Sequence, residues 1–377
     1  MVGQQDIRGG IYTNLIKYTE YPEYKTNSTI PWNIELIKAP FFWAKTKGGG
    51  RVIAIVDTGL NVSHPEFAGR VYNPVNCTGV GAYNDVTDTD GHGTHVAGTV
   101  AGKTVGVCPE CRVMPLKVFG GTNSSEAIRK AFIAIIEHNA NCNPVDKVVA
   151  VNCSFGSAAY DPMLAYNIRT LVSDGVAVCV AAGNSGDGNP ETEEIFSYPA
   201  YINEVITTVS INQDESIANY SNSFDGVDIA APGTYIYSSW KDGGYNTISG
   251  TSMATPHITG TCALLADYYY QKYGKMPLEG DIEAELFGRI RAVDADKRLF
   301  GKGILDLSIE PNIACKEGYM WLNRDIAVID GTNRFIDQPL TYDPTTCRTL
   351  APVRFLLESA GFNVDWDQAL QQVHFYR

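Results

Sequence analysis

Four short runs of apolar residues constrain the fold of this chain more than any other feature. They are rich in β-branched residues and lie at Val52 to Val56, Val148 to Val151, Val176 to Ala182 and Val205 to Val209. Continuous runs of this kind are typical of strands buried on both faces of a parallel sheet. Between them, Asn123 to His138 combines a helix-capping pattern with one apolar face, which predicts a helix. We therefore predict an α/β fold with a doubly wound, mostly parallel sheet.

The sequence pattern divides the chain into three parts. Residues 1–38 are rich in Tyr, Asn, Thr and Pro and lack periodicity, which predicts a short extended arm. Residues 39–312 carry the α/β pattern, whose last long helix begins near Ser252. Residues 316–377 predict a small α+β module with a strand at Ile326 to Ile329, a turn at Asp330-Gly331, a helix near 352–360 and a final strand near Val373 to Tyr376.

Charge and hydropathy exclude several classes of partner. The 377 residues are 44% hydrophobic and carry a formal net charge of -13. A strongly acidic chain repels phosphates and anionic lipids, so we expect neither nucleic acid nor a membrane surface as a partner. The first thirty residues lack the apolar stretch of a secretory signal, and no later run is long enough to span a bilayer. We expect a soluble, cytoplasmic protein.

Two of the polar motifs place an acid and a base near strand and helix ends. Asp57 directly follows the first apolar run, in Val-Asp-Thr-Gly. Aspartic peptidases use two such carboxylates, whereas this chain has a single Asp-Thr-Gly. His92 opens Gly-His-Gly-Thr-His at the expected start of a small-residue helix, and the H-E-x-x-H pattern of a zinc site is absent. We interpret His92 as a general base and His95 as a packed helix residue.

Two further motifs carry a nucleophile and an amide. Ser252 stands at the head of a helix in Gly-Thr-Ser-Met-Ala-Thr-Pro-His, where free N–H groups and the positive end of the helix dipole lie beside its hydroxyl. A serine hydroxyl becomes nucleophilic when an imidazole takes its proton and a carboxylate orients that imidazole. Asp57, His92 and Ser252 supply these three roles. Asn184 follows another buried strand, in Ala-Ala-Gly-Asn-Ser-Gly.

Together these four motifs resemble the signature blocks of the subtilisin family of serine peptidases. The resemblance implies hydrolysis of peptide bonds through an acyl-enzyme on Ser252. It also implies that the Asn184 amide and the Ser252 backbone N–H bind the oxyanion. The implied substrate-binding residues are Ser154, Phe155 and Gly156, which form the strand beside the substrate, and Ala181 and Ser197, which line the primary specificity pocket.

Within that family, the chain resembles the intracellular subtilisins, in Ile37 to Pro40 followed by Trp43 and in Gly186 to Ala200. Leu15-Ile16-Lys17-Tyr18 resembles the Leu-Ile-Pro-Tyr of their short N-terminal extension, which implies that residues 1–38 inhibit the enzyme by lying across its active site. Lys17 stands where those relatives have proline. Because lysine leaves φ free and keeps its N–H, we expect the arm to be cleaved slowly, at or near Tyr18 or within residues 21–30.

The last sixty residues resemble a different module. The stretches Cys347 to Phe355 and Gly361 to Asp367 are similar to the stalk domain named after the N-terminus of bacterial copper amine oxidases. The name implies no copper here, because His374 and Cys347 are lone candidates. We expect residues 316–377 to dock or tether the enzyme, with a ligand that the sequence does not identify.

Calcium is the only cofactor that we expect, as a structural ion with no part in the chemistry. Glu66, Asp187 and Glu191, with Glu193 and Glu194, lie in loop-like segments that offer hard oxygen ligands, and the family commonly binds calcium. The alternative is a solvated acidic surface.

Nine cysteines are scattered along the chain, and we expect most to be reduced. Cys179 and Cys262 lie in apolar runs, so we predict that they are small core residues. Cys108-Pro-Glu-Cys111 is consistent with a redox site, half a zinc site or two cysteines in a turn. We favour the turn, because no second metal-binding pair completes the set.

Other functions for the same motifs stay open at this stage. Transpeptidation would use the same triad with an amine in place of water. A retired peptidase that binds proteins through its tail belongs to another class, and a homodimer is an open alternative to a monomer.

Overall fold

The computed structural model divides the chain into two units, residues 1–311 and 312–377. It describes residues 14–21, 30–192, 197–278 and 280–311, together with seven strand segments between residues 317 and 376.

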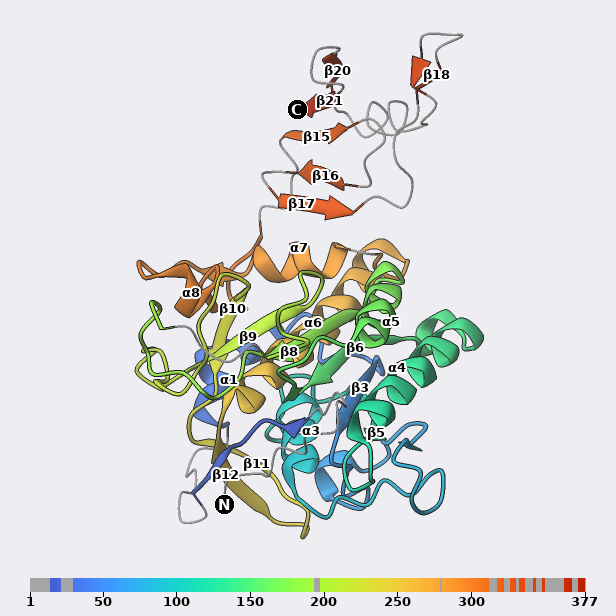
Figure 1. Ribbon diagram of the computed structural model, residues 1–377, viewed down its shortest axis with the longest axis vertical. Coiled ribbons are helices and arrows are strands. Elements are labelled where there is room, and N and C mark those ends of the chain that lie inside the picture. The colour runs from blue at the N-terminus through green and yellow to red at the C-terminus, as the bar shows by residue number, and fades with distance from the viewer. Residues whose placement is uncertain are drawn as a thin grey trace. The chain divides into compact units, whose positions relative to one another are not determined.

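A nine-stranded sheet forms the centre of the first unit (Figure 1). Its order is β13-β14-β10-β9-β8-β6-β3-β5-β4. The strands are β3 Val52–Asp57, β4 Val75–Asn76, β5 Arg112–Lys117, β6 Val148–Cys153, β8 Ala177–Ala181, β9 Ile206–Ile211, β10 Ile229–Pro232, β13 Ile290–Arg291 and β14 Ile304–Leu305. All neighbours run parallel except β13 and β14. The predicted doubly wound, mostly parallel sheet is therefore confirmed.

The four apolar runs form adjacent central strands, β9, β8, β6 and β3, as their composition predicts. Every residue of these strands is buried. Along β3, Ile53 and Ile55 face one hydrophobic cluster, whereas Val52, Ala54 and Val56 face a second cluster on the other side of the sheet. The alternation explains why the run is apolar throughout, since both faces are covered.

Helices cover both faces of this sheet (Figure 1). The longer ones are α3 His92–Ala101, α4 Ser124–Asn141, α5 Pro162–Ser173 and α6 Thr251–Tyr273, and the shorter ones are α1 Trp32–Leu36, α2 Ala39–Phe42, α7 Asp281–Phe287 and α8 Lys297–Phe300. Two 3-10 turns, η1 and η2, span Pro65–Phe67 and Pro144–Asp146. Helices α3 and α6 pack into the cluster that contains Ile53, and α4 and α5 pack into the opposite one.

The helix predicted from residue 123 to 138 is α4, and its cap is the predicted one. The side chain of Asn123 accepts a hydrogen bond from the backbone N–H of Glu126 (3.1 Å). This contact satisfies one of the free N–H groups of the first turn. The helix continues three residues beyond the predicted end, to Asn141.

Two short segments of the arm add to strands of the first unit. β1 (Asn14–Leu15) pairs with β7 (Phe155–Gly156), and β2 (Thr19–Glu20) pairs with β12 (Tyr245–Ser249). β12 itself forms an antiparallel hairpin with β11 (Ile236–Ser239). Residues 14–21 of the arm are therefore extended, as predicted, and are held at both ends. The prediction is wrong for residues 32–36, which form the helix α1, and Ile34 and Ile37 are buried in the core.

The second unit contains a five-stranded antiparallel sheet of order β17-β16-β15-β21-β20. Its strands are β15 Glu317–Trp321, β16 Ile326–Ile329, β17 Thr332–Phe335, β20 Asn363–Asp367 and β21 Gln372–Tyr376, beside a separate pair, β18 Tyr342–Asp343 and β19 Arg348–Thr349. Both predicted strands are present as β16 and β21. The turn at Asp330-Gly331 and the helix near 352–360 lie outside the described residues, and the stalk-module resemblance stays a prediction.

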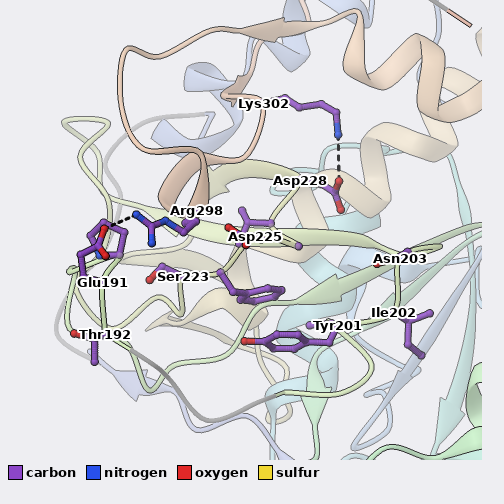
Figure 2. A pocket seen from close by; sticks show the side chains of 15 residues that line it. Glu191, Thr192, Tyr201, Ile202, Asn203, Ser223, Asp225, Asp228, Arg298 and Lys302 are labelled. Carbon is purple, nitrogen blue, oxygen red and sulfur yellow. Dashed lines mark hydrogen bonds and ion pairs between the residues drawn. The ribbon is translucent and has the colours of Figure 1, made fainter. Parts of the chain in front are cut away.

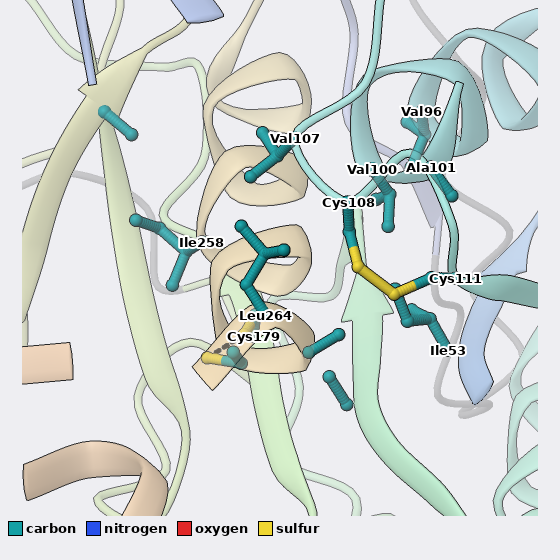
Figure 3. Close-up of a cluster of buried hydrophobic side chains, with 14 of the residues drawn as sticks. Ile53, Val96, Val100, Ala101, Val107, Cys108, Cys111, Cys179, Ile258 and Leu264 are labelled. Atoms are coloured by element: carbon teal, nitrogen blue, oxygen red, sulfur yellow. Dashed lines mark hydrogen bonds between the residues drawn. A yellow bond between two sulfur atoms is a disulfide. The ribbon is translucent and has the colours of Figure 1, made fainter. Parts of the chain in front are cut away.

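The cysteine prediction needs one correction. Cys108 and Cys111 do lie in a turn, where Cys111 N–H donates to the Cys108 carbonyl (3.1 Å), but their sulfur atoms form a disulfide (Figure 3). Spacing alone did not distinguish two thiols from a bonded pair, because both are compatible with a turn. Cys179 and Cys262 are free, fully buried core residues, as predicted.

Close backbone packing at the start of α3 gives a testable consequence. A Cβ on Gly93 would stand 2.3 Å from the carbonyl oxygen of Gly59, which belongs to the turn after β3. We expect Gly93→Ala to lower the free energy of unfolding by about 2–3 kcal/mol, because α3 must move away from β3. Urea unfolding in a Ser252→Ala background measures this without self-digestion. Unchanged stability would show that the contact between α3 and the β3 turn is not tight.

Candidate active site

Asp57 and His92 form a buried hydrogen-bonded pair. Asp57 is the last residue of β3 and His92 the first of α3, and their side chains are 1% and 0% exposed. The Nδ1 atom of His92 lies 2.8 Å from Oδ1 of Asp57. Because an ionised carboxylate only accepts, Nδ1 carries a proton and donates it. In the neutral ring, Nε2 is then the basic nitrogen.

The surroundings of His92 favour its charged form. Burial lowers the pKa of His92, but the charge and hydrogen bond of Asp57 and the charges of Asp90 and Asp88 raise it, and the net shift is upward. A proton that arrives at Nε2 is therefore stabilised by the carboxylate behind the ring.

Asp88 holds the turn that presents His92, a role that the sequence analysis missed. Its buried carboxylate accepts hydrogen bonds from the backbone N–H groups of Gly91 and Thr94 (2.9 Å each) and from the hydroxyl groups of Thr94 (2.7 Å) and Thr58 (2.9 Å). These bonds tie the first turn of α3 to the residue that follows Asp57. An aspartate four residues before the histidine, in Asp-Thr-Asp-Gly-His, was the available signal.

Ser252 is the second residue of α6, which begins at Thr251. Its side chain is fully buried, and its hydroxyl, like Nε2 of His92, has no hydrogen-bond partner within the described ranges. The backbone carbonyl of Ser252 accepts a bond from the Ser154 hydroxyl (3.1 Å), which ties the head of α6 to the end of β6. Helices α3 and α6 pack against one another.

Asn184 follows β8, and Thr251 fixes the orientation of its side chain. The backbone N–H and the hydroxyl of Thr251 both donate to Oδ1 of Asn184 (2.9 and 2.8 Å). The amide nitrogen is thereby directed the other way, and it donates to the backbone carbonyl of Lys17 (2.6 Å). Thr251 was not predicted to have this role, although it belongs to the same motif as Ser252.

The arm passes over these groups as an extended peptide. Asn14 and Leu15 pair with Gly156 and Phe155, and Thr19 pairs with Ser249. Between these anchors, the ring of Tyr18 lies 5.1 Å from the His92 ring, centroid to centroid. The predicted inhibitory segment therefore lies in contact with Asn184 and His92.

A cavity of about 310 Å³ adjoins the arm. It is lined by arm residues 14–17 and by Gly156, Ser157, Ala158, Gly183, Asn184, Ser185, Ser197 and Asn222. Of the predicted substrate-binding residues, Gly156 and Ser197 line it. Ala181 and Phe155 are fully buried and are not among its lining residues, and the Ser154 hydroxyl donates to the carbonyl of Ser252.

His95 and His257 are fully buried and belong to the packing. Nε2 of His95 contacts the Ile236 carbonyl (2.9 Å), in agreement with its interpretation as a packed helix residue. His257, on α6, has Nδ1 at 2.9 Å from the Met253 carbonyl and Nε2 at 2.7 Å from the Asn33 amide. Nδ1 therefore donates and Nε2 accepts, so the ring is neutral.

The predicted calcium ligands do not come together in this structure. The Glu66 carboxylate accepts from Thr104 N–H (2.8 Å) and the Tyr245 hydroxyl (2.7 Å), and Glu191 pairs with Arg298 (2.6 Å; Figure 2). Both Asp187 oxygens accept bonds from residues 189 and 192. Within the described residues, no three His, Cys, Asp or Glu side chains are grouped to hold a metal, and Glu193 and Glu194 lie outside that part. Glu66, Asp187 and Glu191 therefore form no common calcium site among the described residues, and calcium bound elsewhere stays a prediction.

The fold thus combines a buried aspartate–histidine pair with a serine at the head of a neighbouring helix. Comparison with known families matches residues 48–302 to the subtilase family. The chain belongs to this family and is a serine protease. Among its relatives, the major intracellular serine protease of Bacillus subtilis (strain 168) is 36% identical over 310 residues, which cover 80% of this chain and 95% of the relative.

Two other relatives carry similar names. The intracellular serine protease of Paenibacillus polymyxa is 34% identical, over 78% of this chain and 90% of its own length. The alkaline proteinase of Hapsidospora chrysogena is 38% identical, over 60% of this chain and 54% of its own length. No helix among the described residues has the length and apolar character needed to cross a membrane.

The buried neutral histidines predict a loss of stability in acid. Burial lowers the pKa of His257 to about 4 and the pKa of His95 to about 3. Because the unfolded chain binds these protons near pH 6.5, each histidine stabilises the fold above that pH and ceases to do so as pH falls through the folded pKa. We expect a loss on the order of 2 kcal/mol per histidine between pH 7 and pH 5.

Urea unfolding of Ser252→Ala and Ser252→Ala/His257→Gln at the two pH values measures this effect. The second protein keeps a neutral side chain at position 257, so its stability should depend less on pH. Equal pH dependence of stability in the two proteins would contradict the assignment of His257 as a buried neutral histidine.

Proposed function

We propose that this subtilase is an endopeptidase that cleaves extended protein segments through an acyl-enzyme on Ser252, with Asp57, His92 and Ser252 as the catalytic triad. The observation that carries the proposal is the contact between the Asn184 amide and the Lys17 carbonyl (2.6 Å). A peptide carbonyl is thus bound at the group that the family resemblance assigns to the oxyanion, on a segment that also touches His92.

In the proposed mechanism, Nε2 of His92 takes the proton of the Ser252 hydroxyl as its oxygen attacks the substrate carbonyl. The oxyanion is held by the Asn184 amide and the Ser252 backbone N–H. His92 then passes its proton to the leaving amine, and the bond between that nitrogen and the acyl carbon breaks. Water attacks the acyl-enzyme with His92 again as base, which releases the acid product and restores the serine.

The arm is proposed to inhibit the enzyme by occupying this site. Two observations support the idea: main-chain pairing of the arm on both sides of the site, and the Lys17 carbonyl at Asn184. An added strand of this kind takes the hydrogen bonds that a substrate would use. Because Lys17 leaves φ free, the Lys17–Tyr18 bond is open to slow cleavage, which would release the inhibition.

A cytoplasmic location is supported by the word intracellular in the names of two relatives. Residues 316–377 are proposed to dock or tether the enzyme, because they follow the matched region and form their own unit. A structural calcium ion and a homodimer stay predictions. No specific observation favours transpeptidation or a retired peptidase.

Covalent labelling tests the catalytic role of Ser252. We expect a serine-directed sulfonyl fluoride to add one label to Ser252 in the wild type and to abolish casein hydrolysis. Ser252→Ala should take no label and show no hydrolysis, while Ser173→Ala, which changes an exposed serine at the end of α5, serves as the control and should be labelled and active like the wild type. Intact mass and a casein assay measure both outcomes. A fully active protein without label at Ser252 would exclude this serine as the nucleophile.

Incubation of the full chain tests inhibition by the arm. We expect the wild type to shorten by about 17–30 residues with a lag, and its activity on a small peptide to rise by about tenfold as the tethered inhibitor is lost. Ser252→Ala should stay full length. Lys17→Pro should lengthen the lag, and Lys17→Arg should not. Equal activity of full-length and shortened forms from the first minute would remove the arm as an inhibitor.

A further inference from the structure

We propose that Asp90 is a specificity-determining residue that selects a hydrogen-bond donor, tyrosine above phenylalanine, as the first residue after the cleaved bond. The inference rests on the proposed function and names a substrate preference for the same site. Asp90 lies between Asp88 and His92 on the turn that leads into α3.

The first step is the position of Tyr18 relative to the reacting carbonyl. The Asn184 amide binds the carbonyl of Lys17, and the nitrogen attached to that carbonyl belongs to Tyr18. In a peptide bound in this manner, the residue at the place of Tyr18 supplies the leaving amine. The groups that contact Tyr18 are therefore the groups that would contact the first residue after the cleaved bond of a substrate.

The second step is the set of contacts that Tyr18 makes. Its ring lies 5.1 Å from the ring of His92, with a tilt of 36° between the two planes. Its hydroxyl donates to Oδ1 of Asp90 at 2.9 Å. Burial and the hydrogen bond to Asp90 raise the pKa of Tyr18, so the phenol keeps its proton and remains a donor. A phenylalanine would keep the ring contact and lose the hydrogen bond.

The third step is the chemistry of Asp90. A carboxylate accepts hydrogen bonds and cannot donate them when ionised, so it discriminates between side chains by their donors. The same Oδ1 also accepts the backbone N–H of His92 (3.2 Å), which fixes the carboxylate at the head of α3. Hydrogen bonds to charged acceptors are stronger than neutral ones. Asp90 thus favours donor side chains at this place and repels acidic ones.

A competition assay with the full chain tests the proposal. Two peptides carry the arm sequence Asn-Leu-Ile-Lys followed by either Tyr or Phe, and are mixed in equal amounts with the enzyme. The ratio of their products equals the ratio of their kcat/KM values, whatever fraction of the enzyme the arm blocks. We expect the wild type to prefer the Tyr peptide by about fivefold, as for one partly exposed hydrogen bond.

The variants separate the hydrogen bond from other effects. Asp90→Ala should bring the ratio to about one, and Asp90→Asn should leave an intermediate value because its amide oxygen still accepts. A change in the reactivity of His92 would alter kcat/KM for both peptides by the same factor, because the same enzyme cleaves both. It therefore cancels in the ratio. Asp85→Asn, an exposed carboxylate on the same loop, is the matched control and should keep the fivefold preference.

The possible results lead to different conclusions. A wild-type ratio near one, or an unchanged ratio in Asp90→Ala, would overturn the assignment of Asp90 while leaving the peptidase function intact. Cleavage of both peptides at a bond other than Lys–Tyr or Lys–Phe would overturn it as well. Failure of the wild type to cleave any peptide would overturn the proposed function, and this assignment with it.

Discussion

The parallel pairing of β3, β6 and β8 is the constraint on which the site depends. Their register places Val56 beside Cys153 and Cys153 beside Val180, so the three strands end at the same edge of the sheet. Asp57, Ser154 and the segment that leads to Asn184 follow at these ends. Residues far apart in the sequence therefore meet, because parallel strands present their carboxyl ends together.

The polar groups of this site are buried, which increases the effect of each hydrogen bond that they make. Asp57, Asp88, His92 and Ser252 have almost no solvent exposure. In such surroundings a polar group without a partner is costly, and a well-placed partner has a large effect on orientation and on proton affinity. Five donors to Asp88 and two donors from Thr251 to Asn184 supply such partners. The same bonds fix the directions of the imidazole and of the amide.

The arm and a substrate would compete for the same few groups. Lys17 takes the Asn184 amide, and Tyr18 takes the Asp90 carboxylate. A site that recognises main-chain carbonyls and one donor side chain is open to any extended peptide with these features, including its own N-terminal segment. Inhibition and substrate preference would then share one physical basis, and a change at Asp90 would alter both.

The sequence alone determined the sheet, the central strands, the helix α4 with its cap at Asn123, and the motifs that carry Asp57, His92, Asn184 and Ser252. These features follow from local patterns: apolar runs, capping residues and short motifs next to strand or helix ends. Tertiary structure decided the rest. The bond between Cys108 and Cys111 depends on the geometry of one turn. The supporting roles of Asp88 and Thr251, the contact of Tyr18 with Asp90 and the separation of Glu66 from Asp187 and Glu191 depend on distances between segments. Such distances are set by how helices and loops pack on the sheet, so a local motif can indicate Asp88 or Thr251 as a candidate but cannot show which groups it contacts.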